Sequence, residues 1–293
     1  MARRPYAVLA LSLLGISFAA PLVRMSTAHP LAIATWRLGF SLLCIAVMLV
    51  VTGGWRQWRA LNRRTALAAA GAGAMLALHF WSWNTSLALT TVAASVVLVN
   101  LQPAVVALIS AAWLGERPTR RQWSGIAFAM LGAFVVAAQD FGPPDTGGAR
   151  ALLGDVLALA GAVTAALYYT AGRRLRATLD LWPYVGLVYG ACFATLIALS
   201  LALHVPLAPQ PPRELAIFAA LALGPMMLGH TGMNWALKYL PAYVVNLTVL
   251  GEPVGATFLA ALLPGIGEIP TAWTLGGGAL ILLGVLVAAG RPR

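Results

Sequence analysis

The sequence predicts an all-α polytopic membrane protein with ten transmembrane helices, arranged as two inverted repeats of five. Three observations predict this fold: the composition, a series of ten apolar stretches, and an internal duplication. Of the 293 residues, 60% are hydrophobic and only 9% are charged, and the mean hydropathy is +0.84. Soluble globular domains have about 25% charged residues. The lipid bilayer is therefore the expected surrounding of most of the chain.

Each apolar stretch is long enough to cross about 30 Å of hydrocarbon at about 1.5 Å per residue. The stretches are 6–23, 30–51, 66–89, 92–114, 123–139, 151–171, 183–204, 215–236, 242–263 and 272–289. Glycine and proline are concentrated between the fifth and sixth stretches, which is typical of a linker. We therefore divide the chain into a first repeat (1–142), a linker (143–150) and a second repeat (151–293).

The internal duplication is visible as paired residues at a constant separation. Asn84 and Asn234 are 150 residues apart, and so are Pro103 and Pro253. A fixed separation of similar segments indicates a repeat architecture. Because each repeat holds five stretches, an odd number, the second repeat enters the membrane in the opposite sense, as in many secondary transporters.

Lysine and arginine are concentrated in alternate connections between the stretches. With the N-terminus inside, fifteen of them fall on the cytoplasmic side and three, Arg24, Arg150 and Arg213, on the outer side, while Arg37 lies within a stretch. Positive residues favour the cytoplasmic side. We expect a multi-pass protein of the inner (plasma) membrane with both termini in the cytoplasm. Because the net charge of +11 is spread over short loops, nucleic acid is not an expected partner.

Each repeat carries a polar residue directly before a proline inside an apolar stretch. The pairs are Gln102-Pro103 and Glu252-Pro253. Counting from the stretch ends places both polar side chains near the bilayer midplane. A proline removes a helix hydrogen bond, which leaves a free carbonyl oxygen one turn earlier. Pro103 and Pro253 are therefore candidate hinges, and Gln102 and Glu252 are candidate ligand contacts at the depth where secondary transporters hold substrate.

Other polar side chains can be assigned by helical face. His79 and Trp83 are four residues apart, as are His230 and Asn234, so each pair shares a face. The candidate substrate-binding residues are His79, Trp83, Asn84, Asn100, Gln102, His230, Asn234 and Glu252. Structural roles compete for several of them: hydrogen bonding between helices for the two histidines and for Asn84 and Asn234, and interfacial anchoring for Trp83.

Glu252 has three possible roles. It could form a buried ion pair with Arg37, the other charge well inside a stretch; it could couple transport to protons; or it could contact substrate. The three roles remain open at this point.

The two repeats resemble those of the drug/metabolite transporter superfamily, and more closely its EamA-type branch. The residues that carry the resemblance are Val97-Leu98-Val99-Asn100-Leu101-Gln102-Pro103 with Leu114-Gly115-Glu116-Arg117-Pro118, and Gly229-His230-Thr231-Gly232-Met233-Asn234 with Leu250-Gly251-Glu252-Pro253. The resemblance covers nearly the whole chain. It implies ten helices around a central cavity and transport of small metabolites, often outward, as in YddG-type amino-acid exporters.

Transport of a small-molecule substrate is therefore the expected function, with amino-acid export by alternating access as the first hypothesis. A proton-coupled multidrug antiporter for hydrophobic cations is the alternative, since one midplane acid among aromatic residues suits a cation. No HExxH, GxSxG or paired-carboxylate motif predicts an enzyme. We expect no cofactor and no metal. The sequence leaves the oligomeric state open, and a monomer is compatible with it.

The arginine distribution generates a topology prediction. Reporter fusions should place the loops at 56–64 and 173–176 in the cytoplasm and the segment 140–150, which contains the linker, outside. An external signal from the 56–64 loop would contradict the proposed orientation.

Overall fold

The computed structural model describes residues 4–90, 95, 98–138, 148–262 and 272–289, and every element in these ranges is helical. The first half of the chain contains α1 (Arg4–Ser17), α2 (Ala19–Met25), α3 (Pro30–Thr52), η1 (Gly54–Ala60), α4 (Arg63–Leu89), α6 (Gln102–Ile109), η2 (Ser110–Leu114) and α7 (Arg120–Ala138). The second half contains α8 (Gly148–Leu175), α9 (Leu181–Ala202), α10 (Pro212–Leu221), η3 (Ala222–His230), α11 (Thr231–Ala236), α12 (Ala242–Leu247), η4 (Thr248–Gly251), α13 (Glu252–Leu262) and α14 (Ala272–Ala289).

Local sequence signals set several helix ends. His29 caps α3, because its Nδ1 accepts the Leu31 N–H at 3.2 Å, and Pro30 follows in the first turn, where its missing N–H costs nothing. Asn62 caps α4 through a 2.8 Å bond from the Thr65 N–H. Gly53 ends α3 in the left-handed conformation, with φ +65°, which glycine adopts without a Cβ clash.

Four of the expected continuous helices are interrupted. The first stretch changes from α1 to α2 at Phe18, the fourth restarts at Gln102, the eighth contains the π-helical segment η3, and the ninth contains the 3₁₀ segment η4. Prolines explain three of these sites: Pro103, Pro225 and Pro253 each remove a backbone donor. Pro225 lies inside η3, where the single helix expected over 215–236 gives way to wider π-type turns.

Membrane-spanning dimensions are evident in six stretches of the described residues. Arg4–Met25, Pro30–Thr52, Arg63–Leu89, Arg150–Leu175, Leu181–Ala202 and Pro212–Ala236 are long and apolar enough to cross a bilayer. Gln102–Leu114 and Leu275–Gly284 are shorter apolar helices. The protein is therefore a polytopic helical membrane protein. The count of ten spans stays a prediction, because parts of the stretches at 92–114 and 242–263, and most of the linker, lie outside the described residues.

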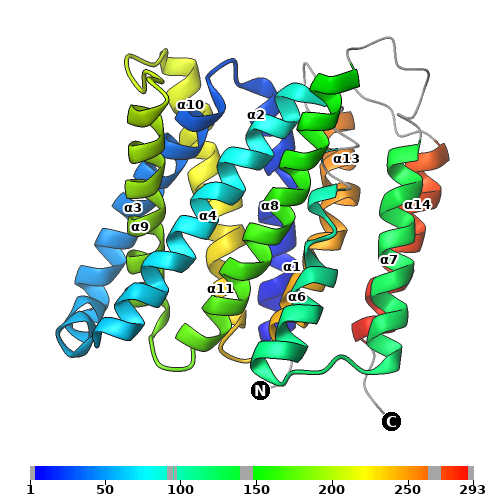
Figure 1. The fold of residues 1–293 in the computed structure, drawn as a ribbon, viewed down its shortest axis with the longest axis horizontal. Helices are drawn as coiled ribbons and strands as arrows, with labels where there is room; N and C mark the ends of the chain where they lie inside the picture. Colours follow the sequence, from blue (N-terminus) through cyan, green and yellow to red (C-terminus); the bar gives the residue numbers. More distant parts are fainter. Residues whose placement is uncertain (1–3, 91–94, 96–97, 139–147, 263–271, 290–293) are drawn as a thin grey trace.

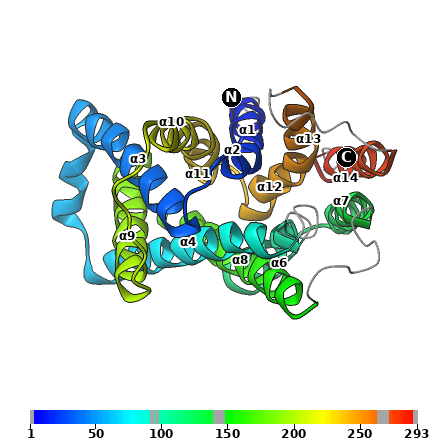
Figure 2. The same cartoon turned by 90° about the horizontal axis from the view of Figure 1, so that it is seen from above.

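The helices form one bundle in which each half of the chain packs on the other (Figure 1, Figure 2). Helix α1 packs on η3 and α11, and α4 packs on α8; α3 packs on α9, α6 on α12, and α7 on α14. Each stretch of the first half has a counterpart five stretches later in the second half. If every stretch is replaced by its counterpart, the same set of packed pairs results. Figure 1 also shows that α1 and α8, which begin the two halves, run in opposite directions.

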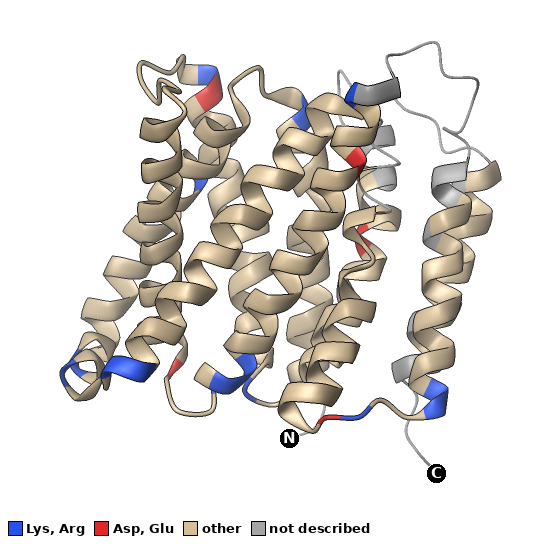
Figure 3. Cartoon of the chain, viewed as in Figure 1, with Lys and Arg blue, Asp and Glu red and all other residues tan. Residues whose placement is uncertain are grey.

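Lysine and arginine residues are concentrated at one end of the bundle. Helix α1 begins and α14 ends at that end (Figure 1). Figure 3 shows that most of the drawn lysines and arginines lie there too, at the ends of helices and in the connections between them.

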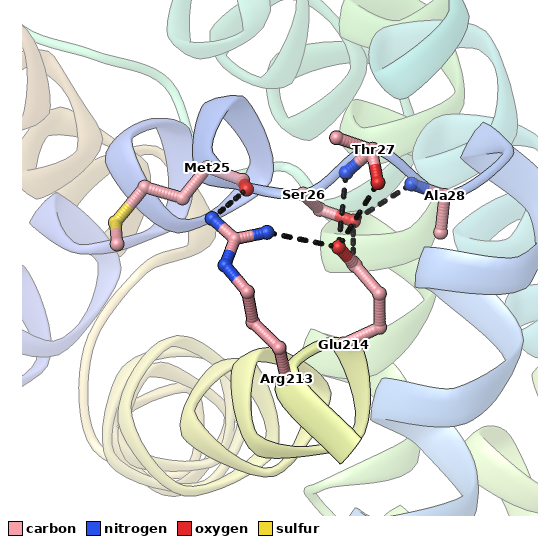
Figure 4. Close-up of polar contacts among 6 residues, drawn as sticks. All are labelled: Met25, Ser26, Thr27, Ala28, Arg213 and Glu214. Atoms are coloured by element: carbon pink, nitrogen blue, oxygen red, sulfur yellow. Dashed lines mark hydrogen bonds and ion pairs between the residues drawn. The ribbon is translucent and has the colours of Figure 1, made fainter. Parts of the chain in front are cut away.

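The opposite end of the bundle holds a polar cluster that joins the halves (Figure 4). Glu214, in the first turn of α10, is 3% exposed. Its carboxylate accepts hydrogen bonds from the Ser26 hydroxyl and from the Thr27 N–H and hydroxyl, the latter two at 3.2 Å, and it pairs with Arg213 at 3.1 Å. The connection between α2 and α3 is thereby fixed to the start of α10. Sequence reasoning did not single out Glu214.

Two glycines of α4 provide a matched test of how tightly this bundle is packed. A Cβ on Gly73 would lie 2.6 Å from the Ala191 Cβ and 2.8 Å from the Cys192 nitrogen, whereas a Cβ on Gly71 would meet nothing within 4 Å. We expect Gly73→Ala to destabilise the fold by about 1–3 kcal/mol through overpacking of α4 against α9. Gly71→Ala should be neutral or stabilising by up to about 1 kcal/mol, from helix propensity alone.

Unfolding of the two purified variants in detergent, followed by circular dichroism against denaturant, measures the difference. Equal stability of the two variants would mean that α4 and α9 are not in close contact in the folded protein.

Candidate functional site

A cavity lies between the two halves, where the helix interruptions meet. It contains about 490 Å³ of space free of protein atoms, including its open mouth. Its lining residues are Ile16, Ala19, Arg37, His79, Phe80, Trp83, Val99, Gln102, Tyr169, His230, Met233, Val249 and Glu252. These residues come from both halves of the chain. Backbone irregularity inside a membrane protein is tolerated where it lines such a cavity, because water or ligand can satisfy the freed groups.

Five of the eight candidate residues border this cavity. They are His79, Trp83, Gln102, His230 and Glu252, and the suggested partner Arg37 borders it as well. The structure therefore brings together, from both halves, most of the polar residues that the sequence singled out.

Aromatic rings and the two histidines form one wall of the cavity. The rings of His79 and Trp83 are parallel within 2°, with centroids 6.3 Å apart. His230 meets Phe80 edge to face at 5.4 Å, and its Nδ1 lies 3.2 Å from the Tyr169 hydroxyl. Such ring pairs add stabilisation beyond the apolar area that they bury. The wall is thus apolar in bulk, with imidazole and hydroxyl groups at its surface.

His79 is anchored by the neighbouring half of the bundle. Its Nδ1 lies 3.0 Å from the Gly161 carbonyl oxygen on α8. Because a carbonyl only accepts hydrogen bonds, Nδ1 carries the proton in this contact. The histidine thus has a structural bond and a place in the cavity wall at once, so the two interpretations of this residue are compatible.

Gln102, at the edge of the cavity, connects the interrupted fourth stretch to the interrupted ninth stretch. Its side-chain amide donates to the Oδ1 of Asn246, and the Asn246 Nδ2 donates to the Ala242 carbonyl oxygen at 3.0 Å. Pro103 lies in the first turn of α6, directly after Gln102, and Pro253 lies in the first turn of α13, directly after Glu252. Each candidate hinge therefore adjoins a polar side chain of the cavity.

Arg37 and Glu252 line the same cavity without forming an ion pair. The ion pairs among the described residues join Arg173 to Glu116, Arg213 to Glu214, and Lys238 to Asp180. Arg37 is only 1% exposed. In this conformation the buried pair suggested by the sequence is absent, because Arg37 lies against Phe80 and Met226 instead.

Three candidates, Asn84, Asn100 and Asn234, are buried but do not border the cavity. Asn84 donates to the Pro30 carbonyl oxygen at 3.3 Å. The Asn234 amide donates to the hydroxyls of Tyr168 and Tyr189 and accepts from Tyr184 at 3.4 Å. Both side chains join neighbouring helices. The helical face shared with His230 suggested a cavity position for Asn234, but three tyrosines of α8 and α9 hold its amide away from the cavity.

Charged residues form contacts between helices at the end of the bundle where α1 begins, and one ion pair joins the two halves. Glu116 pairs with Arg173 at 2.7 Å and accepts the Ala242 N–H at 3.2 Å. Asp180 pairs with Lys238 at 3.1 Å. Hydrogen bonds from Lys238 and from the Gln57 amide hold the pKa of Asp180 below its usual range. The first contact joins the residues after η2 to α8. The second joins the connection between α11 and α12 to the connection between α8 and α9.

Sequence reasoning missed several residues of the site. Phe80 and Tyr169 complete the aromatic wall, Met233 adds an apolar contact, and Asn246 holds Gln102. The sequence signal for two of them was their position near candidate residues. Phe80 follows His79, and Asn246 lies six residues before Glu252 in a stretch with few polar residues. Among the described residues, no group of three His, Cys, Asp or Glu side chains is arranged to hold a metal ion.

A helical membrane bundle with a mostly apolar cavity between its halves, lined by a few polar groups, fits the architecture of secondary transporters. The chain belongs to the EamA-like transporter family, whose model matches residues 5–138 and 152–290. The resemblance noted from the sequence is thereby confirmed.

Named relatives are transporters as well. The chain is 26% identical over 271 residues to the uncharacterized transporter YyaM of Bacillus subtilis, covering 90% of this chain and 86% of that protein. It is 30% identical over 196 residues to a protein of Streptantibioticus cattleyicolor named "Probable terminal-alkyne amino-acid exporter", covering 65% of this chain and 61% of that one. A solved crystal structure superposes with a TM-score of 0.79 at 21% identity, covering 98% of this chain and 96% of its own, and shows the same fold.

The two repeat-mate asparagines allow a test of the structural role assigned to Asn234. We expect Asn234→Leu to lower the melting temperature of the purified protein, because buried tyrosine hydroxyls lose their partners at about 1–3 kcal/mol each. Asn84→Leu should cost less, since it removes one 3.3 Å bond. The apparent affinity for a transported substrate should stay at the wild-type value in the folded fraction of both variants. A weakened affinity with unchanged melting temperature in Asn234→Leu would instead make Asn234 a ligand contact.

Proposed function

We propose that the protein is a secondary transporter of the plasma membrane that exports amino acids by alternating access. The observation that carries the proposal is the cavity between the two halves, which holds a carboxylate and an arginine among apolar and aromatic side chains. Binding sites for small molecules are mostly apolar with a few placed polar groups. The relative named as an amino-acid exporter supports the same substrate class.

Two inverted repeats would provide the moving parts. We propose that residues 1–142 and 151–293 are the repeats, with 143–150 as their linker. The opposed directions of α1 and α8, and the helix pairs that are unchanged when the halves are exchanged, support this division. The inverted halves can alternate by rocking against each other around a site between them. Pro103 and Pro253, each beside a cavity residue, are the proposed hinges.

We also propose that both termini face the cytoplasm. The support is the concentration of lysine and arginine at the end of the bundle where α1 begins and α14 ends (Figure 3). In this orientation the Glu116–Arg173 contact lies on the cytoplasmic side and the Glu214 cluster on the outer side. Each side of the cavity then has a polar contact between the two halves that opening would break.

A proton-coupled antiporter for hydrophobic cations is the second candidate. Glu252 and the rings of Phe80, Trp83 and Tyr169 would attract an aromatic cation. Arg37, which borders the same cavity, opposes this function, because a buried guanidinium repels a cationic drug across a medium of low dielectric constant. The charge composition of the cavity therefore favours a ligand that also carries a negative group.

Transport in proteoliposomes separates the two candidates. Vesicles loaded with unlabelled leucine should accumulate labelled leucine by exchange, and vesicles containing a fluorescent cationic dye should retain it. Protein-free vesicles and vesicles with heat-denatured protein are the controls. Dye movement without exchange of leucine, methionine or phenylalanine would favour the multidrug antiporter and contradict amino-acid export.

A further inference from the structure

Arg37 is held in the cavity wall by weak contacts. Its Nη2 lies 3.7 Å from the Met226 sulfur, and its Cζ lies 4.2 Å above the ring centroid of Phe80. The other two donor atoms, Nε and Nη1, are buried and have no hydrogen-bond partner in the part of the chain that the structure describes. A thioether is a weak acceptor, and a ring face offers no lone pair. Nη2 has two N–H groups and only this weak contact, so an anion can bind the guanidinium at Nη2 together with either Nε or Nη1.

The carboxylates that the structure describes are engaged elsewhere, with one exception. Glu116 pairs with Arg173, Glu214 with Arg213, and Asp180 with Lys238. Asp155 accepts the Thr90 hydroxyl at 2.9 Å. The exception is Glu252, which borders the cavity and forms no ion pair there.

A cavity with one unpaired charge of each sign favours a ligand that carries both. A buried charge needs a partner, and an arginine fork matches a carboxylate through two parallel hydrogen bonds. A carboxylate such as Glu252 in turn accepts hydrogen bonds from an ammonium group. The remaining wall offers Ile16, Val99, Met233 and Val249 to an uncharged side chain.

Resting on the proposed amino-acid transport, we infer that Arg37 and Glu252 together recognise a zwitterion. Arg37 binds the α-carboxylate, Glu252 binds the α-ammonium group, and an apolar side chain of the amino acid lies against the aromatic and aliphatic wall. Neither residue would then be a permanent structural charge. Arg37 and Glu252 do not pair with each other, and the ligand supplies the partner of each. The arrangement rejects amines, which leave Arg37 unpaired, and simple acids, which leave Glu252 unpaired.

Competition binding to the purified protein tests this inference. Labelled leucine is displaced by unlabelled leucine, by 3-methylbutylamine, which lacks the carboxylate, and by 4-methylpentanoate, which lacks the ammonium group. Loss of one partner of a buried charge pair typically weakens binding by at least about 30-fold. We therefore expect both analogues to compete at least about 30-fold more weakly than leucine. Leucine methyl ester, which keeps the ammonium group but loses the anionic carboxylate, should behave like the amine.

Variants assign each end of the ligand to its residue. The measured quantity is the ratio of the affinity of leucine to that of each analogue. In Arg37→Met the ratio of leucine to 3-methylbutylamine should fall to about one, and in Glu252→Gln the ratio of leucine to 4-methylpentanoate should fall to about one. A purely structural role would change the amount of folded protein without changing these ratios. Arg176→Met is the matched control: Arg176 is 2% exposed, donates to the carbonyl oxygens of Asn234 and Leu179, and does not border the cavity. Its ratios should equal those of wild type.

Failure of the zwitterion inference can be distinguished from failure of the proposed amino-acid export. If leucine, methionine or phenylalanine binds and is transported but the amine and the acid compete equally well, the zwitterion assignment is wrong and amino-acid export stands. If folded protein binds none of these amino acids, both proposals fail. Should Arg37→Met not fold, Arg37→Lys, which keeps the charge but loses the fork, is measured in its place. The competition series on wild type decides the matter without any variant.

Discussion

The absence of water inside a bilayer is the constraint on which the rest of this structure depends. A polar group there must find its partner within the protein or at an internal cavity, because lipid offers none. Asn234 meets the constraint with tyrosine hydroxyls, Gln102 meets it with Asn246, and His79 meets it with the Gly161 carbonyl. The interrupted helices meet it by gathering their irregular segments around one space. Several buried polar groups do not meet it within the described residues, among them the hydroxyls of Thr35 and Ser200 and two nitrogens of Arg37. Arg37 is the charged member of this set, and we propose that a ligand satisfies it.

Contacts between the halves occur at three levels of the bundle, and their chemistry differs. At the two ends the contacts are polar and reversible: Glu116 with Arg173 at one end, and Glu214 with the loop before α3 at the other. Between them the halves meet around the cavity through Gln102 and Asn246. Ion pairs near a surface exchange readily for water and contribute little net stability. In the alternating-access mechanism that we propose, these contacts would break at one end at a time while the packing of the long helices is kept.

Tight helix packing would supply the rigidity for the proposed movement. Without a hydrophobic force between helices in lipid, close approach of small residues stabilises their association. Gly73 brings α4 onto α9, and Gly132 brings α7 onto α14, each so close that a Cβ would overlap the neighbouring helix. Gly15 does the same for α1 on η3, with backbone atoms of Gly229 and Gly224 within about 3 Å of the Cβ position. All three glycines thus lie where the two halves of the chain meet.

The sequence by itself determined the membrane class, the duplication, the family and most boundaries of the long helices, because these depend on composition, period and local breakers. It also indicated His79, Gln102, His230 and Glu252, since polar residues in apolar stretches are few and costly. Only the tertiary structure decided which polar residues share a cavity and which are satisfied between helices, as Asn234 is. It also decided that Pro225 produces a π-helical segment and that Arg37 lies against Phe80 and Met226 rather than in an ion pair with Glu252. The reason is that helical period fixes the face of a residue, whereas its partner depends on how distant helices are rotated and packed together.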